Sequence, residues 1–530
     1  MSITPSIYML YSTFTPPPST GFHGYCFVDS DYIFGAEGAA QYAAATGRVI
    51  GPGEDGCYIS IERTSETVEF GADAAGTAKL FYYDKAGVWA VSNSLARLVD
   101  HLRENGVRLA PNLPQLDALS WGITFTKQVS SFATIFNEIR LLPSDRRLVL
   151  TPCGLREKAR PEPSLLPYPD ALRSFIDTWT SRFATLFLDD RIRITLDLTG
   201  GVDSRAIFAL AKTGLARADV SPSRAIFRSA TTPRWKKDLK IATSLAERYG
   251  IAVNPQEQAA QTKLSGEERY TRWREVCLGV YLPIYLHDST VDPFTIHING
   301  GGGENHRHFY PAVPASRFLR DQRKRAPAYL YNEWLNDTEE ALAYLADQND
   351  TTEPLILHYR EFRNRFHTGR PPLYRTGFAP LTTTLFHRSA MLGGITHAGQ
   401  LNFDIMENLI PGLKDFRYDD PSKAPTDETL KNLTIVDLDQ NATAGQTYIG
   451  DTTAPQQQDR GRGDRKPMEL IALEGTKALK KEAVVSFVDD SVLTQAQAVL
   501  ESAVSAGNFE HATLAKGVSF VLAAELALGD

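Results

Sequence analysis

The chain has 530 residues, enough for two or three domains with cores of their own. Its 42% hydrophobic and 22% charged residues are typical of a soluble globular protein, and a net charge of −7 argues against a general nucleic-acid binder. The chain has no run of about 18 apolar residues, so we expect no membrane-spanning helix. It starts without a signal-peptide pattern, and its four cysteines lack metal-ligand spacing, so we expect reduced thiols in a cytoplasmic protein.

Residues 1–150 contain short segments that alternate in polarity or are rich in β-branched and aromatic residues, which is typical of strands. The expected strands are 6–11, 24–29, 57–62, 67–71, 79–84 and 87–92. A helix is expected over 93–103, because Leu95, Leu98 and Leu102 share a face at helical spacing. This order predicts a layered antiparallel α+β domain.

A proline-rich linker at 151–170 separates this part from one in which strands and helices alternate. We therefore expect two domains, 1–160 and 165–530. Expected helices are 170–186, 237–249, 272–286, 468–506 and 512–528, with a mainly helical region at 310–405. Expected strands are 192–198, 224–228, 251–254 and 294–298. This alternation predicts a doubly wound α/β parallel sheet with helical additions, which binds ligands at the carboxyl ends of its strands.

The most informative stretch, residues 192–208, reads I-R-I-T-L-D-L-T-G-G-V-D-S-R-A-I-F. It predicts a buried strand, a small-residue turn at 199–201 and a helix directly after the turn. A helix N-terminus binds anions, and glycines let the backbone approach an anion closely. Thr199 and Ser204 offer hydroxyls to phosphate oxygens, whereas Asp203 would repel a bare phosphate and is consistent with an intervening Mg²⁺.

A second glycine-rich segment, N-G-G-G-G-E-N-H-R at 299–307, also follows an expected strand. The two segments should therefore meet at one edge of the sheet. We interpret Gly302 and Gly303 as backbone close to a pyrophosphate, and Arg307 as a partner of phosphate charge. Glu304 would be the second carboxylate on Mg²⁺, opposite Asp203.

The sequence T-G-G-V-D-S at 199–204 resembles the [ST]-G-G-x-D-S pyrophosphate loop of enzymes that split ATP between the α and β phosphates. Upstream, the D-x-x-G, L-F-Y-Y and S-N-S-L patterns within 73–95 are similar to the N-terminal glutaminase-type domain of asparagine synthetases. The chain thus resembles the asparagine synthetase and β-lactam synthetase superfamily, as an adenylating, amidotransferase-like member close in kind to lasso-peptide cyclases or β-lactam synthetases. The resemblance implies a degenerate Ntn-hydrolase-like domain followed by an ATP-pyrophosphatase domain of the adenine nucleotide alpha hydrolase-like type.

Three departures from that family pattern matter for function. A working glutaminase of the family exposes cysteine as its first residue, whereas Met1 is followed here by Ser2, and Cys26 lies too deep in the chain to supply a terminal amine. Thr383 stands where the family has an acceptor-side aspartate, and Gly301 stands where β-lactam synthetases carry a catalytic tyrosine. We therefore expect an inactive glutaminase scaffold and a different acceptor; a residual role of Ser2 as nucleophile stays open.

The resemblance also implies a set of site residues. It implies a catalytic lysine on a mobile loop, for which Lys423 and Lys466 are the two candidates. It implies metal ligation by Asp203 and Glu304. The expected ATP- and pyrophosphate-binding residues are Leu198, Thr199, Gly200, Gly201, Asp203, Ser204, Gly302, Gly303 and Arg307.

The implied activity is that of an ATP-dependent, AMP-forming carbon–nitrogen ligase or cyclase with ATP and Mg²⁺ as cofactors. It would adenylate a carboxylate of a small molecule or peptide and let an amine attack, within the same molecule or from a second substrate, in natural-product or antibiotic biosynthesis. Three alternatives stay open: ammonia-dependent amidation of a small-molecule or sugar carboxylate, adenylation that ends in another nucleophile, and a degenerate nucleotide-binding protein. We expect no nucleic-acid or membrane partner, and leave open a homodimer or a biosynthetic partner protein.

Overall fold

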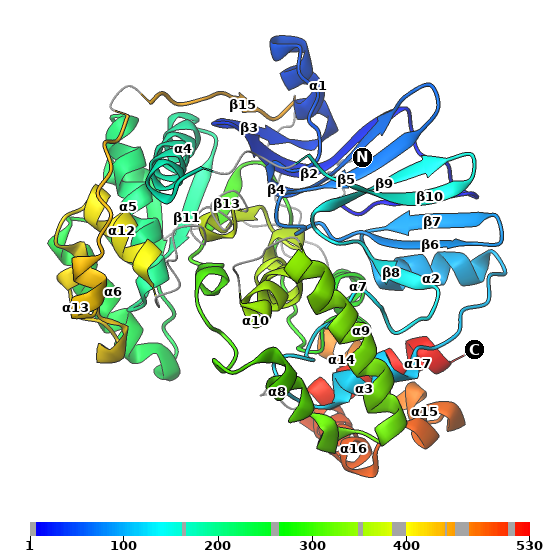
Figure 1. The fold of residues 1–530 in the computed structure, drawn as a ribbon. Coiled ribbons are helices and arrows are strands. Elements are labelled where there is room, and N and C mark those ends of the chain that lie inside the picture. Colours follow the sequence, from blue (N-terminus) through cyan, green and yellow to red (C-terminus); the bar gives the residue numbers. More distant parts are fainter. Residues whose placement is uncertain are drawn as a thin grey trace.

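A computed structural model describes residues 7–161, 166–255, 264–347, 353–383, 399–439, 442–450, 466–506 and 515–529. It is a mixed α/β structure with antiparallel sheets on one side and a parallel sheet with its helices on the other (Figure 1). No helix among the described residues is both long and apolar enough to span a membrane.

The first 160 residues build two antiparallel sheets. One sheet has the order β1 (Leu10–Ser12), β7 (Val88–Ser92), β6 (Phe81–Lys85) and β8 (Ile139–Leu141). The other runs β10 (Gly154–Ala159), β9 (Arg146–Thr151), β5 (Val68–Ala72), β4 (Asp55–Arg63), β2 (Thr20–Val28), β3 (Asp31–Phe34) and β15 (Thr447–Tyr448). Phe70 of β5 packs on Tyr11 of β1 and on Trp89 of β7, so the sheets face each other across an aromatic core. We call this antiparallel part, residues 7–161, the sandwich. The layered antiparallel arrangement is as predicted, apart from β15.

β15 comes from far along the chain and pairs in parallel with β3, at Thr447 with Tyr32 and Tyr448 with Ile33. It crosses the boundary expected at residues 160–165, since it lies in the segment assigned to the second domain. Its two residues carry no alternating pattern from which a strand could be predicted. Three helices accompany the antiparallel sheets: α1 (Gly35–Thr46), α2 (Leu95–Glu104) and α3 (Leu113–Ser120).

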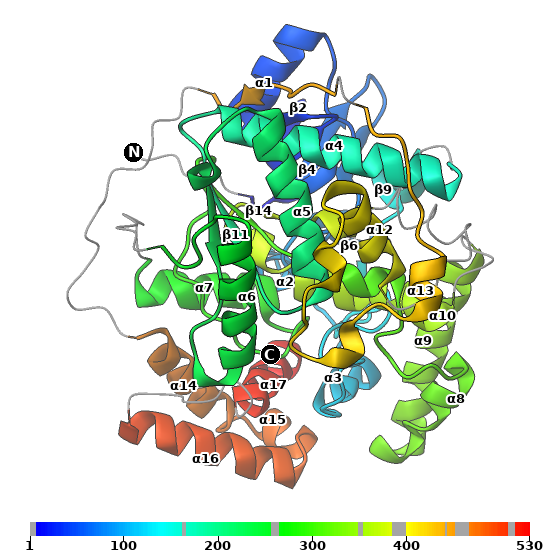
Figure 2. The same ribbon diagram turned by 90° about the vertical axis from the view of Figure 1, so that its left-hand side faces the viewer.

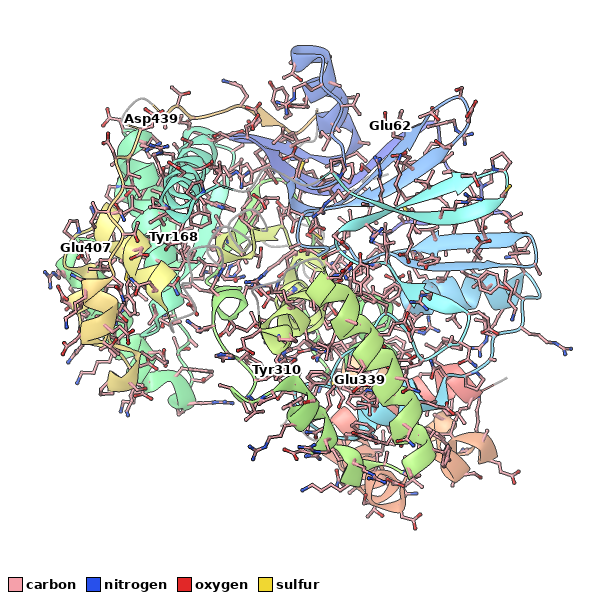
Figure 3. The ribbon with its side chains drawn as sticks, viewed as in Figure 1. Glu62, Tyr168, Tyr310, Glu339, Glu407 and Asp439 are labelled. Carbon is pink, nitrogen blue, oxygen red and sulfur yellow. The ribbon has the colours of Figure 1, made fainter. Side chains whose placement is uncertain are left out.

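The parallel sheet has the order β12 (Ala225–Arg228), β11 (Arg193–Asp197), β13 (Thr295–Ile298) and β14 (Gly377–Phe378). α4 (Tyr168–Leu188) packs on α5 (Val202–Arg217) at Gly214, where a Cβ would overlap Phe183. α12 (Gln400–Leu409) lies beside α5 in both views (Figure 2). Tyr168 of α4 donates to Asp404 of α12 at 2.6 Å and thereby anchors that helix (Figure 3).

The described residues of the second part contain six further α-helices before the C-terminal group. They are α6 (Lys236–Arg248), α7 (Gly266–Cys277), α8 (Ala315–Arg320), α9 (Ala328–Asp347), α10 (Pro354–His358) and α13 (Asp427–Lys431). Of these, α6 lies beside α5 (Figure 2). The C-terminal helices α14 (Pro467–Ala478), α15 (Glu482–Phe487), α16 (Asp490–Ala506) and α17 (Ala515–Leu528) pack on one another (Figure 2).

Several expected elements differ in extent from those of the structure: the strand expected over 6–11 is β1, Leu10–Ser12, and the stretch expected as helical over 468–506 forms α14, α15 and α16. The helix expected over 272–286 ends at Cys277, because Gly279 takes a φ of 76° and Tyr281 pairs with Gln128 of the sandwich. The strand expected over 251–254 makes only a single bridge, from Val253 to Phe227.

A π-helix, Tyr359–Thr368, continues α10 and connects the sandwich to the parallel sheet. Its buried Glu361 accepts from the backbone N–H and the hydroxyl of Ser144, at 3.0 and 2.6 Å. Its buried Arg365 pairs with Glu361 and donates to the carbonyls of Gly76 and Leu142. The charges of Glu361 and Arg365 are thus compensated by each other and by groups of the sandwich, which fixes how the helix is placed.

Lys79 makes a further contact of this kind. Its buried ammonium donates to the carbonyls of Thr77 at 2.7 Å and Gly369 at 3.4 Å. Burial lowers the pKa of Lys79 to about 8, from an ordinary 10.5, so the charged form is disfavoured in the folded chain.

We predict that Lys79→Met removes a pH dependence of stability between about pH 8 and 10.5. In that window the unfolded chain binds a proton at Lys79 that the folded chain has released, so the free energy of unfolding of the wild type rises with pH, by up to about 3 kcal/mol. Urea unfolding of both chains at pH 7.5 and pH 10 measures this, and the tyrosines that titrate nearby are common to both. Equal pH slopes would contradict the prediction.

Candidate active site

The predicted anion-binding turn lies between the end of β11 at Asp197 and the start of α5 at Val202. Leu198 donates its N–H to the carbonyl of Arg228 at 2.7 Å, which ties the turn to the neighbouring strand β12. Within the turn the hydroxyls of Thr199 and Ser204 lie 3.0 Å apart, and Ser204 also accepts from the N–H of Thr199. The two hydroxyls therefore close the turn on itself.

The glycine-rich segment after β13 packs directly against this turn, as predicted from the strand order. A Cβ at Gly303 would overlap the carboxylate of Asp203, and one at Gly300 would lie 2.9 Å from the backbone nitrogen of Ser204. Gly302 takes a φ of 93°, which L-residues with a side chain rarely adopt. Close approach and backbone conformation together explain this run of glycines.

Asp203, Glu304 and Arg307 form one charged cluster between the two segments. Arg307 donates from Nη1 to Asp203 Oδ1 at 3.0 Å and from Nη2 to Oδ2 at 2.8 Å, and Nη2 also contacts Glu304 Oε1 at 3.2 Å. Asn402 of α12 adds a 2.8 Å hydrogen bond to Asp203 Oδ1. Burial raises the pKa of Asp203, and Arg307 opposes that rise.

The carboxylates of Asp203 and Glu304 have the oxygen chemistry that Mg²⁺ prefers. The guanidinium of Arg307 lies between them, however, and the described residues include no group of three or more metal-ligating side chains. The cluster as described therefore does not fit a metal ion unless Arg307 moves away. The metal role of Asp203 and Glu304 stays a prediction, and neither bond-forming step proposed for this chain requires it.

Two carboxylates that the sequence did not single out also contact the turn. Asp238 of α6 accepts from the backbone N–H of Gly200 at 3.1 Å, and Asp419 packs on Gly200 so closely that a Cβ there would lie 2.6 Å from that of Asp419. The only signal for Asp238 is its place in the first turn of α6, which also suits ordinary helix capping.

Lys423 is brought to the turn through Asp419, to which it donates at 2.6 Å. Arg205, on the first turns of α5, is fully buried and stacks on the ring of Tyr418 at 3.7 Å. It also donates to the carbonyls of Gly200, Phe416 and Arg417. Arg205 thus clamps the segment that carries Lys423 onto the predicted loop, a role that sequence reasoning missed.

Lys466 is placed elsewhere, at the start of α14, a helix that packs on α7, α16 and α17 (Figure 2). Ser2 lies outside the described residues. Cys26 is fully buried in β2, and burial raises the pKa of its thiol well above the ordinary value. That environment suits a structural cysteine rather than a nucleophile.

A cavity of about 30 Å³ lies between the sandwich and the stretch that runs from the end of the π-helix to Thr383. Asp55 and Thr77 line it from the sandwich, and Thr368 and Thr382 from the other side. Thr368 and Thr382 are also the side chains that a Cβ at Gly301 or Gly302 would strike, so two residues of the cavity wall pack against the glycine-rich segment.

No family model matches the chain, and no curated protein matches it. Among solved structures, it is similar to glutamine phosphoribosylpyrophosphate amidotransferase from B. subtilis complexed with ADP and GMP, with 8% sequence identity and a TM-score of 0.12. The similarity covers 53% of this chain and 46% of that one, so the chain spans about half the length of that protein. A TM-score this low supports no argument about fold or activity.

We predict that Gly303→Ala lowers the free energy of unfolding by about 1–3 kcal/mol, because the added methyl group overlaps the Asp203 carboxylate in a packed site. Gly51→Ala is the matched control, since a Cβ there meets nothing within 4 Å. Urea unfolding followed by circular dichroism measures both. Equal losses in the two variants would show that the close approach at Gly303 does not constrain the chain.

We predict that Arg307→Gln raises the affinity of the ligand-free protein for Mn²⁺ by about tenfold, because removing the guanidinium leaves two carboxylates free to face one cation. Electron paramagnetic resonance of free Mn²⁺ measures the affinity without any substrate. The control is Arg173→Gln, which removes an exposed pair with Asp170 on α4. An unchanged affinity would mean that Asp203 and Glu304 do not form a metal site even when freed.

Proposed function

We propose that the chain is an ATP-dependent, AMP-forming carbon–nitrogen ligase of the asparagine synthetase-like kind, with a degenerate Ntn-type sandwich and a doubly wound ATP-pyrophosphatase domain. The observation that carries the proposal is the contact between the 199–204 turn and the 300–303 glycines. Two segments that follow neighbouring parallel strands meet at the carboxyl edge of the sheet, with no room for a side chain between them. Ligands of such sheets bind at this edge.

The turn offers donors suited to phosphate oxygens. The N–H of Gly200 already donates to a carboxylate oxygen of Asp238, which shows that an anionic oxygen fits there. The hydroxyls of Thr199 and Ser204 lie at the same turn, and Arg307 adds a positive charge beside it. These groups would orient the β and γ phosphates of ATP and leave the α-phosphorus open to attack.

The proposed reaction has two steps. A carboxylate oxygen of the substrate attacks the α-phosphorus, the bond to the bridging oxygen breaks, and pyrophosphate leaves. An amine nitrogen then attacks the acyl carbon, AMP leaves with the electron pair of its oxygen, and the nitrogen loses a proton. Lys423, held by Asp419 next to Gly200, would stabilise the negative charge that develops in both steps. Mg²⁺ would neutralise pyrophosphate if Arg307 moved aside.

In the main proposal the attacking amine has one of two sources. It belongs to the same molecule, as in a β-lactam or macrolactam cyclase, or it comes from a second substrate. The cavity next to the glycine-rich segment favours a second candidate, ammonia-dependent amidation of a small-molecule or sugar carboxylate. Its 30 Å³ is enough for about two water-sized molecules, and hence for ammonia.

A third candidate is a nucleotide-binding protein without turnover. Arg307 occupies both carboxylates, and Asp238 occupies a backbone donor of the turn, so ligand binding must displace these contacts or accommodate them. A protein that only binds nucleotide could keep them in place.

The test is carboxylate-dependent exchange of labelled pyrophosphate into ATP, over a panel of amino acids, β-amino acids and small peptides. Asp203→Asn and Lys423→Ala are each expected to reduce the exchange rate by about 100-fold or more, because Lys423 would stabilise the developing negative charge and Asp203 fixes Arg307 beside the turn. Asp170→Asn and Lys431→Ala, exposed residues on α4 and α13, are the matched controls.

Each outcome distinguishes the candidates. Exchange that depends on one class of carboxylate and is lost in Asp203→Asn supports the ligase. Formation of ADP and phosphate contradicts the assignment to α–β cleavage. ATP binding without turnover on any substrate, ammonia included, favours the binding protein.

A further inference from the structure

Arg370 is a buried guanidinium that pairs with no carboxylate among the described residues. It follows the π-helix directly and is only 5% exposed. Its Nε and Nη1 are buried and make no hydrogen bond within the part of the chain that the structure describes. Its contacts are two tyrosine rings, with the guanidinium carbon 4.0 Å from the ring centre of Tyr285 and 5.1 Å from that of Tyr281.

A second guanidinium faces the same ring. Arg363 is 8% exposed and lies 5.9 Å from the ring centre of Tyr281. Its Nη1 donates to Gln128 at 3.0 Å, but its buried Nε makes no hydrogen bond to any described residue. Neither arginine forms an ion pair with a carboxylate of the described residues. Two positive charges therefore lie around Tyr281 without a compensating negative charge.

The histidines nearby report the same positive environment. His367 lies 2.7 Å from the hydroxyl of Tyr281, and burial, reinforced by Arg363 and Arg370, lowers its pKa to about 3. Burial, reinforced by Arg370 and Arg375, lowers the pKa of His287 to about 4, with only the exposed Asp288 among the larger contributions acting in the opposite direction. Both histidines are therefore neutral at physiological pH and add no further charge.

We infer that Arg363, Arg370, Tyr281, Tyr285 and His367, the Arg370 cluster, form a binding site for a small oxyanion with carboxylate or phosphate oxygens. Buried guanidinium groups are normally paired, because an uncompensated charge in a poorly solvated place is unfavourable. Because no carboxylate of the described residues takes this place, an anion that binds from outside would supply the compensating charge. Arginine donors fit two oxygens of such a group at once, and the tyrosine rings hold the planar guanidinium in place.

The cluster lies under an exposed ring and has a physical link to the candidate active site. Tyr285, on whose ring Arg370 stacks, is 37% exposed, so an anion would reach the buried guanidinium past this ring. Thr368, two residues before Arg370, packs on Gly301 of the glycine-rich segment, and the carbonyl of Gly369 accepts from Lys79. The site is nevertheless separate from Asp203 and does not depend on the proposed function.

Equilibrium dialysis with labelled inorganic phosphate, at constant ionic strength and without ATP, tests this inference. Succinate in a parallel titration distinguishes a carboxylate ligand from a phosphate ligand. Arg370→Gln is expected to raise the dissociation constant for phosphate by about tenfold or more, since it removes the positive charge and the paired N–H donors of the guanidinium. Arg224→Gln is the matched control, because Arg224 lies just before β12, donates to the backbone carbonyls of Phe187, Asp189 and Ile192, and has its ion pair with the exposed Asp190.

Two further variants keep the test decisive. Tyr285→Ala changes an exposed side chain and is expected to weaken phosphate binding even if Arg370→Gln does not fold, as judged by near-ultraviolet circular dichroism. Thr199→Val alters the predicted phosphate turn. Binding that is lost in Thr199→Val and unchanged in Arg370→Gln and Tyr285→Ala would assign the phosphate to that turn and overturn the inference. The absence of any phosphate or succinate binding would overturn it as well.

Discussion

The rest of the structure depends on the ion pair between Arg307 and Asp203. The pair is bidentate, with two N–H groups of Arg307 on the two carboxylate oxygens of Asp203. It joins α5, the helix that follows β11, to the segment that follows β13. The glycines that follow β11 and β13 have no side chains to pack. The ion pair therefore provides side-chain contacts between the two segments, and Asn402 of α12 holds Asp203 in place. Because both partners are only about one-fifth exposed, removing one would leave a poorly solvated charge. That constraint makes the position of the glycine-rich segment well defined before any ligand binds.

The sequence was informative where a local pattern is sufficient to determine local structure. The strand, glycine turn and helix at 192–208 lie where they were expected, because β-branched residues, two glycines and helical spacing each specify one element. The meeting of Asp203, Glu304 and Arg307 followed from strand order alone. The pairing of Arg307 with both carboxylates did not, since nothing in a sequence says whether two carboxylates will hold a metal ion or a guanidinium.

Contacts between residues far apart in the chain could not be predicted from the sequence. Asp238, Asn402 and Asp419 reach the turn from three segments whose local patterns suit ordinary caps and surface positions. Arg205 reads as one more residue of an amphipathic helix, and only its stacking on Tyr418 shows that it fixes the segment carrying Lys423. Likewise, Glu361 and Arg365 of the π-helix read as solvated charges in the sequence, and only the structure shows that the sandwich supplies partners for them.

The electrostatics of the site bear on whether the chain is an enzyme or only a binder. Three aspartates and a glutamate surround the turn, while Arg307 and Lys423 each neutralise carboxylates rather than stand free. A triphosphate that enters this place must therefore compete for both cations against carboxylates already bound to them. Such competition is compatible with catalysis if the cations transfer to the leaving pyrophosphate as its charge grows, because stabilisation then appears mainly in the transition state. It is equally a reason for weak ground-state binding. Pyrophosphate exchange that is rapid at saturating ATP, despite a high dissociation constant for ATP, would be the mark of that arrangement.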